Sequence, residues 1–237
     1  PKALGVDVLF SEPDRQHPDD DAQLAQAIAQ AGNVVLPVDW RMANVDIGAE
    51  LPLASLRQAA RQLGHVNVTV DDDGVIRRYF GAQGENTGPW PHFSIAMLCA
   101  SGQSHPLCQG TRPPEPGEQW EQSSPEIFNF ARGDRPYTLY SAEDVLAGRI
   151  PEDSFRGKYV LLGATASGLG DYFASPARPA SRHIAGVELI AHALDSQLSD
   201  QHVHALLPGA NLAVNLGAIV LALMAIALLG PMAGLIA

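Results

Sequence analysis

A long uncharged stretch near the C-terminal end limits the folds open to this chain more than any other feature. The sequence has 237 residues, and none after Asp200 is Lys, Arg, Asp or Glu. Within this stretch, residues 212–229 are apolar apart from Asn215. A helix of about 20 apolar residues is long enough to cross the hydrocarbon core of a bilayer. We therefore predict a membrane-spanning helix, because core helices of soluble proteins are seldom so long without a charge.

The residues around this run predict how the chain is divided. Gly230 and Pro231 end the helix, and the residues after them are apolar again, as at the start of a second membrane helix. We expect an extracytoplasmic domain, a juxtamembrane segment with the membrane helix, and a truncated second helix. The bounds of these parts are 1–200, 201–230 and 231–237. Both ends of the chain are expected to lie within a longer protein.

The net charge of the chain limits the classes of molecule that it can bind. All 26 acidic and 15 basic residues precede position 201, so the expected extracytoplasmic domain carries the whole formal charge of −11. Nucleic acids and anionic lipid surfaces are bound through basic patches. The charge therefore disfavours both as partners. The hydrophobic fraction of 46% also excludes disorder of the chain as a whole.

The first part of the chain alternates between strand and helix patterns. Residues 4–10 are an apolar run with a single charge, Asp7, and predict a buried strand. Three aspartates precede a helical pattern over 22–31, and residues 34–38 predict the next strand. Strand, helix and strand in this order are typical of a parallel βαβ unit.

The same alternation continues toward the membrane helix. The Asp73-Gly74 pair predicts a hairpin turn, so the sheet is expected to be mixed. Residues 158–163 have the composition of a buried strand, and 101–125 that of a long exposed loop. Further strands are predicted at 65–70, 75–80 and 127–130, and further helices at 53–63, 90–99, 141–148 and 186–198. The predicted fold class is α/β, with a mixed, largely parallel sheet, helices on both faces and a C-terminal transmembrane helix.

The chain has two cysteines, Cys99 and Cys108. They flank a short segment with Gly, Ser and Pro, and in an oxidising compartment they can close a small disulfide loop. Two unrelated thiols, with Cys99 packed on a helix face, are an equally good interpretation. The spacing alone does not decide between them.

Several ordered blocks of residues resemble a known family. These blocks are GVDVLFSEPD (5–14), GNVVLP (32–37), GHVNV (64–68), DDGVIRR (72–78), DVLAGR (144–149), FRGKYVLLGATA (155–166), Gly170-Asp171, GVE (186–188), Ala191 and ALD (193–195). Their order and spacing are similar to those of the second class of CHASE domains, the extracellular sensory domains associated with cyclases and histidine kinases. The resemblance covers nearly all of residues 5–198.

The resemblance implies a receptor plan. In that family an N-terminal membrane helix, the external sensor and three closely spaced membrane helices precede a cytoplasmic output domain. The output is an adenylate or diguanylate cyclase, a histidine kinase or a Ser/Thr kinase. We accordingly expect this chain to sense a small molecule or an envelope signal from the periplasm or cell exterior, anchored in the inner membrane. The bilayer is the expected partner, a homodimer the expected assembly, and neither a cofactor nor catalysis is expected.

The sequence also departs from the family pattern. Family members usually have a strand and a helix before the block that begins at Gly5, so the sheet is expected to lack its first strand. Family members often have His at the position of Ile190 and Asn at that of His192. If the family's His serves a site, this chain must do without it or use His192, two residues further along the chain.

The best candidate site is the Gly-rich loop over 163–171, together with the end of the first strand. A loop that follows a strand of an open α/β sheet is where such sheets bind ligands, and its glycines let backbone N–H groups approach a polar group. A tight crossover that needs small residues is the alternative, since the loop lacks the Gly-Lys-Ser/Thr ending of a P-loop. The candidate ligand-binding residues are Ser11, Glu12, Asp14, Gly163, Ala164, Thr165, Ser167, Gly168 and Asp171.

Other polar residues favour structural roles. A buried Asp7 needs a partner, which predicts a structural pairing more than catalysis. His202 and His204 suit a solvated juxtamembrane linker, and no metal site is expected because further ligands are not fixed. Ser167 is not in a Gly-x-Ser-x-Gly turn. The rival functions are a tethered cell-envelope hydrolase, for which no nucleophile, base and orienter converge in the sequence, and a ligand-free dimerisation scaffold.

Overall fold

A computed structural model gives the fold of the chain. It describes residues 1–42, 47–85, 89–108, 120–123, 125–131, 133, 136–166, 168, 171–177, 183–199 and 208–229. The chain separates into two compact units, Pro1–Val203 and His204–Ala237. The first unit contains the sheets and all but one of the helices named below, and the second contains one long helix.

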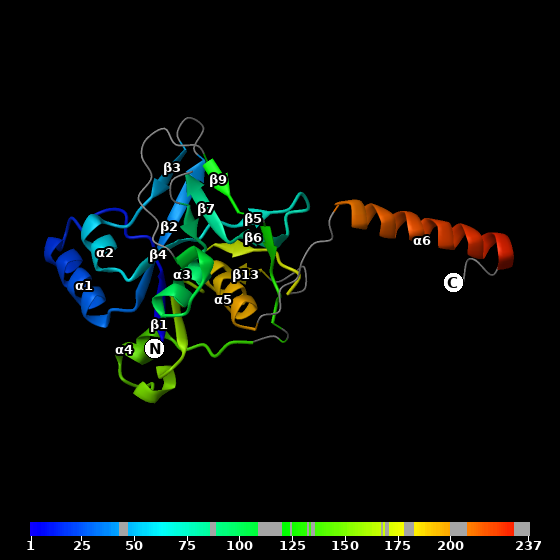
Figure 1. Ribbon diagram of the computed structural model, residues 1–237. Coiled ribbons are helices and arrows are strands. Elements are labelled where there is room, and N and C mark those ends of the chain that lie inside the picture. The colour runs from blue at the N-terminus through cyan, green and yellow to red at the C-terminus, as the bar shows by residue number, and fades with distance from the viewer. Residues whose placement is uncertain are drawn as a thin grey trace. The chain divides into compact units, whose positions relative to one another are not determined.

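A central sheet forms the middle of the first unit (Figure 1). Its strands are β1 (Ala3–Asp7), β2 (Val34–Met42), β3 (Ile47–Glu50), β4 (Gln62–His65) and β11 (Tyr159–Gly163). Strand β1 lies between β11 and β2 and runs parallel to both, and β4 continues the parallel pairing on β2. Strand β3 pairs with β2 in the antiparallel direction. The prediction of a mixed, largely parallel sheet is confirmed.

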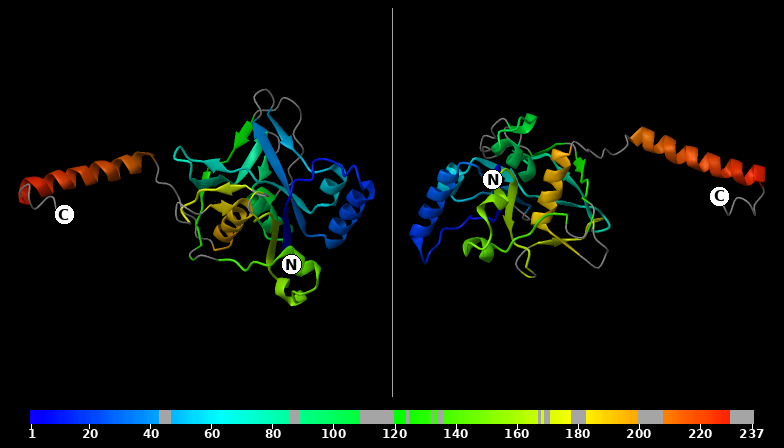
Figure 2. Two further views of the ribbon diagram at one scale, coloured as in Figure 1. Left: turned by 180° about the vertical axis from the view of Figure 1, so that it is seen from behind. Right: turned by 90° about the horizontal axis from the view of Figure 1, so that it is seen from below.

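Helices cover both faces of this sheet. They are α1 (Pro18–Ala31), α2 (Ala54–Ala59), α3 (Phe93–Ala100) and α5 (Gly186–Leu198). Alternate residues of β2 point to opposite faces. Leu36 packs with Ile28 of α1 and Leu56 of α2, whereas Val35 packs with Met97 of α3 on the other side. The views in Figure 2 show α1 and α5 on opposite sides of the central sheet.

Two glycines let α3 lie close against the sheet. A Cβ atom at Gly5 of β1 would lie 2.6 Å from Cε1 of Phe93 and 2.8 Å from Sδ of Met97. A Cβ atom at Gly64 of β4 would lie 2.7 Å from Cα of Phe93 and 2.9 Å from Cβ of Ala96. A larger residue at Gly64 would meet the backbone of α3 and push the helix off the sheet, whereas one at Gly5 would displace side chains that pack between α3 and the sheet.

Short strands and helices complete the first unit. They are β5 (Thr69–Val70), β6 (Ile76–Phe80), β7 (Ala82–Glu85), β8 (Trp90–Pro91), β9 (Trp120–Gln122), β10 (Pro125–Ile127), β12 (Tyr172–Phe173), β13 (Ile184–Ala185), α4 (Ala142–Leu146) and the 3-10 turns η1 (Pro106–Cys108) and η2 (Glu152–Phe155). Strands β5 and β6 form the antiparallel hairpin predicted at Asp73-Gly74, and β10 pairs with the other edge of β6. Strand β12 pairs with β13, which leads directly into α5.

Several predicted boundaries were wrong. The helix expected over 53–63 ends at Ala59, and its last residues belong to β4. The strand expected over 65–70 is divided between the end of β4 and β5. The loop expected over 101–125 contains η1 and β9, while 109–119 lie outside the described residues. At β4, β5 and β9, pairing with another strand overrides the local pattern.

Helix α3 also differs from the prediction of an amphipathic helix over 90–99. It begins at Phe93, because Trp90 and Pro91 form β8. Every residue from Phe93 to Cys99 is buried. The sheet covers one side of α3, and α5 and η1 contact it elsewhere. A helix enclosed in this way is apolar all round.

Strand β11 is less buried than its sequence predicts. It is the outermost strand on its side of the described central sheet, and Leu162 is 44% exposed. Its apolar composition indicates a strand, but composition cannot show whether a second neighbour is present. The absence of a first strand, expected from the family pattern, stays a prediction.

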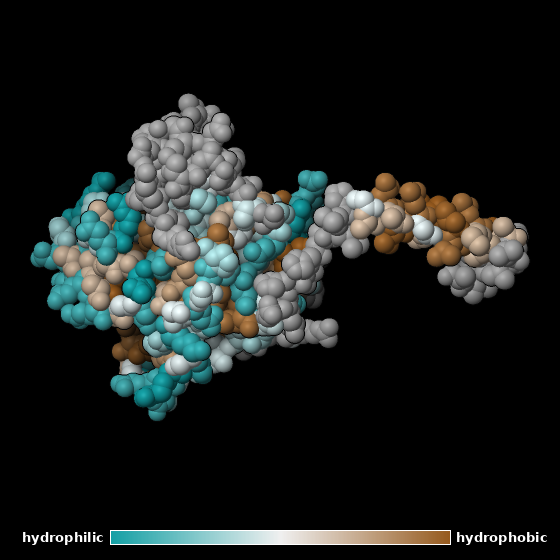
Figure 3. All heavy atoms as spheres, in the orientation of Figure 1, coloured by the Kyte–Doolittle hydropathy of each residue, from teal (hydrophilic) through white to brown (hydrophobic). Residues whose placement is uncertain are grey.

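The second unit contains α6 (Pro208–Leu229). Within it, Gly209–Ala227 is apolar and long enough to cross a membrane, with a mean hydropathy of 2.1. None of that stretch is buried against other parts of the protein. The face of α6 in view in Figure 3 is mostly brown, the colour of hydrophobic residues. An isolated apolar helix of this length is typical of a transmembrane segment and atypical of a soluble core.

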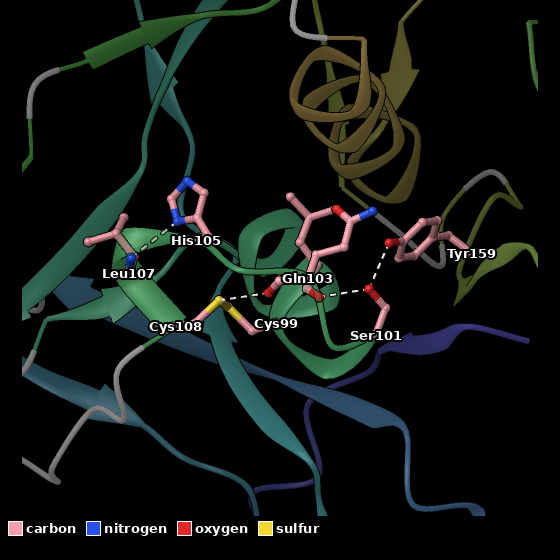
Figure 4. Close-up of a disulfide and its surroundings, with 8 residues drawn as sticks. Cys99, Ser101, Gln103, His105, Leu107, Cys108 and Tyr159 are labelled. Atoms are coloured by element: carbon pink, nitrogen blue, oxygen red, sulfur yellow. Dashed lines mark hydrogen bonds between the residues drawn. A yellow bond between two sulfur atoms is a disulfide. The ribbon is translucent and has the colours of Figure 1, made fainter.

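A disulfide closes the end of α3. Cys99 in the last turn of α3 is joined to Cys108 in η1, with Cα atoms 5.3 Å apart. Between them, the Ser101 hydroxyl lies 2.7 Å from the hydroxyl of Tyr159 on β11 (Figure 4). The loop is thereby fastened both to its own helix and to the edge of the central sheet.

The Cys99–Cys108 disulfide predicts a mass difference between the oxidised and the reduced peptide. Protein purified without reductant should yield a peptide spanning Cys99 and Cys108 that is lighter by two hydrogens than after reduction, and neither cysteine should react with an alkylating reagent before reduction. Non-reducing peptide mass spectrometry measures both properties. Two freely alkylated thiols in oxidised protein would contradict the pairing.

Candidate functional site

The carboxyl ends of β1 and β11 form the natural binding position of the central sheet. The chain leaves β1 through α1 to reach β2 on one side, while β11 lies on the other side of β1. The direction of the strand order therefore reverses between β1 and β11. Open α/β sheets bind ligands at such reversal points, outside the carboxyl ends of the strands. Asp7 and Gly163, the last residues of these strands, are paired in register.

Asp7 is the most unusual group at this position. It is half-buried, and none of the side-chain hydrogen bonds and ion pairs found among the described residues involves it. Burial raises the pKa of Asp7 to about 6, and the negative charge of Asp171 adds to the rise. The partner predicted for Asp7 is thus not found among the described residues. Instead, the negative charge of the exposed Asp171 acts on the half-buried Asp7 and disfavours its ionised form.

The Gly-rich loop contacts the start of α5 at both of its ends. A Cβ atom at Gly163 would lie 2.7 Å from Cβ of Val187 in the first turn of α5. At the other end, the carbonyl of Asp171 accepts a hydrogen bond from the N–H of Gly186 at 3.0 Å. Gly163 is therefore needed for close packing, as the crossover interpretation proposed for this loop requires.

Inside the loop, the described residues are open to solvent. Ala164, Thr165 and Gly168 are exposed. Gly168 has a φ angle of +86°, a conformation that favours glycine. The Tyr172 hydroxyl donates to the carbonyl of Thr165 and holds the loop to β12. Ser167 lies outside the described residues.

The candidate residues after β1 make mostly local contacts. The Ser11 hydroxyl donates to Oε1 of Glu50 at 2.6 Å. Asp14 accepts hydrogen bonds from two backbone N–H groups just before α1. On the surface, Oε2 of Glu12 lies 3.8 Å from Nη2 of Arg15. Among the interactions of the described residues, none joins these three side chains to the Gly-rich loop. The structure therefore brings together Asp7, Gly163 and Asp171, and Asp7 was missed as a site residue.

A sequence signal for Asp7 was available. It is the single charge in an otherwise apolar strand, and it ends that strand. A buried carboxylate at a strand end is either paired or functional. The sequence alone favours a structural pairing, because structural networks also perturb the pKa values of acids.

The described part of the domain contains buried histidines. His65 ends β4 and is fully buried. Burial lowers the pKa of His65 to about 3, so the ring is neutral at physiological pH. His192 is also buried, and its Nδ1 accepts hydrogen bonds from the Tyr137 hydroxyl and the Ala131 N–H. His202 and His204 lie outside the described residues.

Comparison with known proteins identifies the architecture. The family model of the CHASE2 domain matches residues 1–229, which include both the α/β unit and α6. Neither the search of curated proteins nor the search of solved structures found a match.

Proposed function

The chain belongs to the CHASE2 domain family, and from this membership we propose that residues 1–200 sense a signal in the periplasm or outside the cell and regulate a cytoplasmic output domain. CHASE2 domains are extracellular sensory domains of signalling receptors. The match over residues 1–229 is the observation that carries the proposal, because it spans the sensor and α6 together. A nucleotide cyclase, a diguanylate cyclase or a kinase is the proposed output.

The proposed orientation places α6 across the inner membrane with the α/β unit outside the cytoplasm. The apolar composition of α6 and the disulfide both support this, because disulfides persist in oxidising compartments. Single cysteines introduced at Glu12 and Glu152, both exposed, are expected to react with a membrane-impermeant thiol reagent on intact bacteria. Labelling that occurs only after lysis would place the domain in the cytoplasm and contradict the orientation.

We place the sensing site at the carboxyl ends of β1 and β11, around Asp7, the exposed loop residues and Asp171. A positively charged group entering here would offset the negative charges of Asp7 and Asp171 and stabilise the ionised form of Asp7. The chemistry of this edge therefore favours a signal that carries a positive charge. Both ends of the loop contact the first turn of α5, so a shift in the loop has a direct route to this helix.

Variants of the full-length receptor test this site. Asp171→Asn removes one carboxylate without changing the size of the side chain, and is expected to change the response of the output domain at least several-fold. A ligand shifts a receptor only through its differential affinity for two states, for which a coupling of about 1–3 kcal/mol is typical. The measurement is output activity per receptor across growth conditions.

Asp72→Asn is the matched control, because Asp72 is an exposed aspartate on the β5–β6 turn. It should leave the response unchanged. If Asp171→Asn and Asp7→Asn both match wild type in every condition, the sensing site lies elsewhere and its assignment is wrong.

A further inference from the structure

The C-terminal half of α5 has buried polar side chains on a face that packs inside the domain. His192 and Ser196 are each 2% exposed and are four residues apart, hence on one side of the helix. Gln197 follows in the same turn and is half-buried. Buried polar groups of this kind need hydrogen-bond partners, and one stretch of chain supplies nearly all of them. That stretch is Glu126–Ala131 together with Tyr137, which we name the clasp.

Backbone groups of the clasp bind the first two of these side chains. The N–H of Asn129 donates to Oγ of Ser196 at 3.0 Å. The N–H of Ala131 donates to Nδ1 of His192 at 3.2 Å. Since Nδ1 accepts this bond, the Tyr137 hydroxyl 2.8 Å away also acts as its donor. The clasp thus crosses one full turn of α5.

A third set of hydrogen bonds joins the clasp to α5 and to strand β6. Nε2 of Gln197 donates to Oε2 of Glu126 at 2.6 Å and to the hydroxyl of Tyr79 at 2.9 Å. The Tyr79 hydroxyl in turn donates to the same Glu126 oxygen at 2.8 Å. Tyr79 belongs to β6, and its ring packs on that of Phe128 with centroids 4.8 Å apart. The three side chains form a closed triangle between α5, β10 and β6.

The same strand links the clasp to the proposed sensing site. The N–H of Ile76, the first residue of β6, donates to the carbonyl of Ala174 at 2.8 Å. Ala174 directly follows β12, which begins at the residue after Asp171. A displacement of the loop therefore reaches α5 by two routes. One passes through Gly186 at the start of the helix, and the other passes through β6 and the clasp to its C-terminal half.

We infer that the clasp is a control element that holds α5 in one of its signalling positions. This inference rests on the proposed function, in which α5 passes the signal toward the membrane. The clasp binds α5 through hydrogen bonds to side chains of the helix. Water can replace these hydrogen bonds when the clasp and α5 separate. Phe128 of the clasp also shares a core cluster with Leu189 and Ala193 of α5, so release of α5 must open this apolar contact together with the hydrogen bonds.

Hydrogen–deuterium exchange of the whole chain in nanodiscs tests whether the clasp restrains α5. Ser196→Ala leaves the Asn129 N–H without its partner, and is expected to speed exchange of the clasp amides and the last two turns of α5 about tenfold. Tyr137→Phe keeps the ring and removes only the hydroxyl, so it serves as the gentler variant. Ser199→Ala is the matched control, since the exposed Ser199 bonds only to α5 among the residues that the structure describes. Unchanged exchange in both clasp variants would overturn the inference.

Signalling by the full-length receptor gives the second measurement. Ser196→Ala and Tyr137→Phe are expected to shift output per receptor at least threefold in the absence of a stimulus, while Ser199→Ala does not. A merely structural role would lower receptor abundance and leave output per receptor unchanged, and that result contradicts the inference. If the clasp variants shift output while Asp7→Asn and Asp171→Asn do not, the control role of the clasp is supported and the assignment of the sensing site is wrong. The reverse pattern rejects the clasp and retains the site.

Discussion

Replacing Asp7 with Asn is expected to raise the free energy of unfolding of the sensory domain by about 3 kcal/mol at pH 7. The pKa of Asp7 in the folded protein is about 6, against an ordinary value of 3.8 for an aspartate. A difference of about two pH units corresponds to about 3 kcal/mol. The cause is first the burial of the carboxylate and then repulsion by Asp171, and Asn retains the shape without the charge.

The sign of the effect depends on pH in a definite way. Below about pH 4, Asp7 is protonated in both the folded and the unfolded chain, and Asp7→Asn should change stability little. Between about pH 4 and 6 the unfolded chain releases the proton while the folded chain retains it, so wild-type stability falls as pH rises. Above about pH 6 the carboxylate is charged in both states, and the stabilisation by Asn reaches its full value.

Urea unfolding between pH 4 and 8, followed by tryptophan fluorescence under non-reducing conditions, measures this dependence. Asp171→Asn should stabilise in the same direction by a smaller amount, because it removes only the repulsion. Asp72→Asn should change stability by less than about 0.5 kcal/mol, as exposed substitutions usually do. An Asp7→Asn variant whose stability follows that of wild type at every pH would show that the buried charge carries no penalty.

Replacing Gly64 with Ala is expected to destabilise the domain by about 3 kcal/mol or more. The added Cβ would lie 2.7 Å from Cα and 3.1 Å from N of Phe93, and both are backbone atoms of α3. A flexible side chain could turn away from such a contact, but a helix backbone must move as a whole. Helix α3 is packed against the sheet and α5, so its displacement disturbs a core cluster with members on β1, β2, α3 and α5.

Gly186→Ala provides the comparison for this change. Its Cβ would meet nothing closer than 3.7 Å, and Ala is the better helix former. The same unfolding experiment should therefore show a change within about 1 kcal/mol for Gly186→Ala. Equal effects of the two substitutions would mean that glycine flexibility, rather than the close approach of α3, explains the requirement at Gly64.

Local patterns determined much of the architecture. The membrane helix depends only on the composition of consecutive residues, and α6 extends over the predicted run. The order of β1, α1 and β2 and the hairpin at Asp73-Gly74 follow from periodicity and turn chemistry over a few residues. The family resemblance, carried by several short blocks in order, is confirmed by the match over residues 1–229.

The tertiary structure alone decided which of these elements meet. The exposed edge at β11 and the enclosure of α3 depend on neighbours that no local pattern reports. The charge of Asp171 acts on Asp7, and Asn129 bonds to Ser196, across large separations in the chain. A side chain's burial, pKa and partners depend on such contacts, because they follow from distances in space and not along the sequence. The sequence therefore determined the class of protein, and the fold decided where a sensing site and its route to α5 can lie.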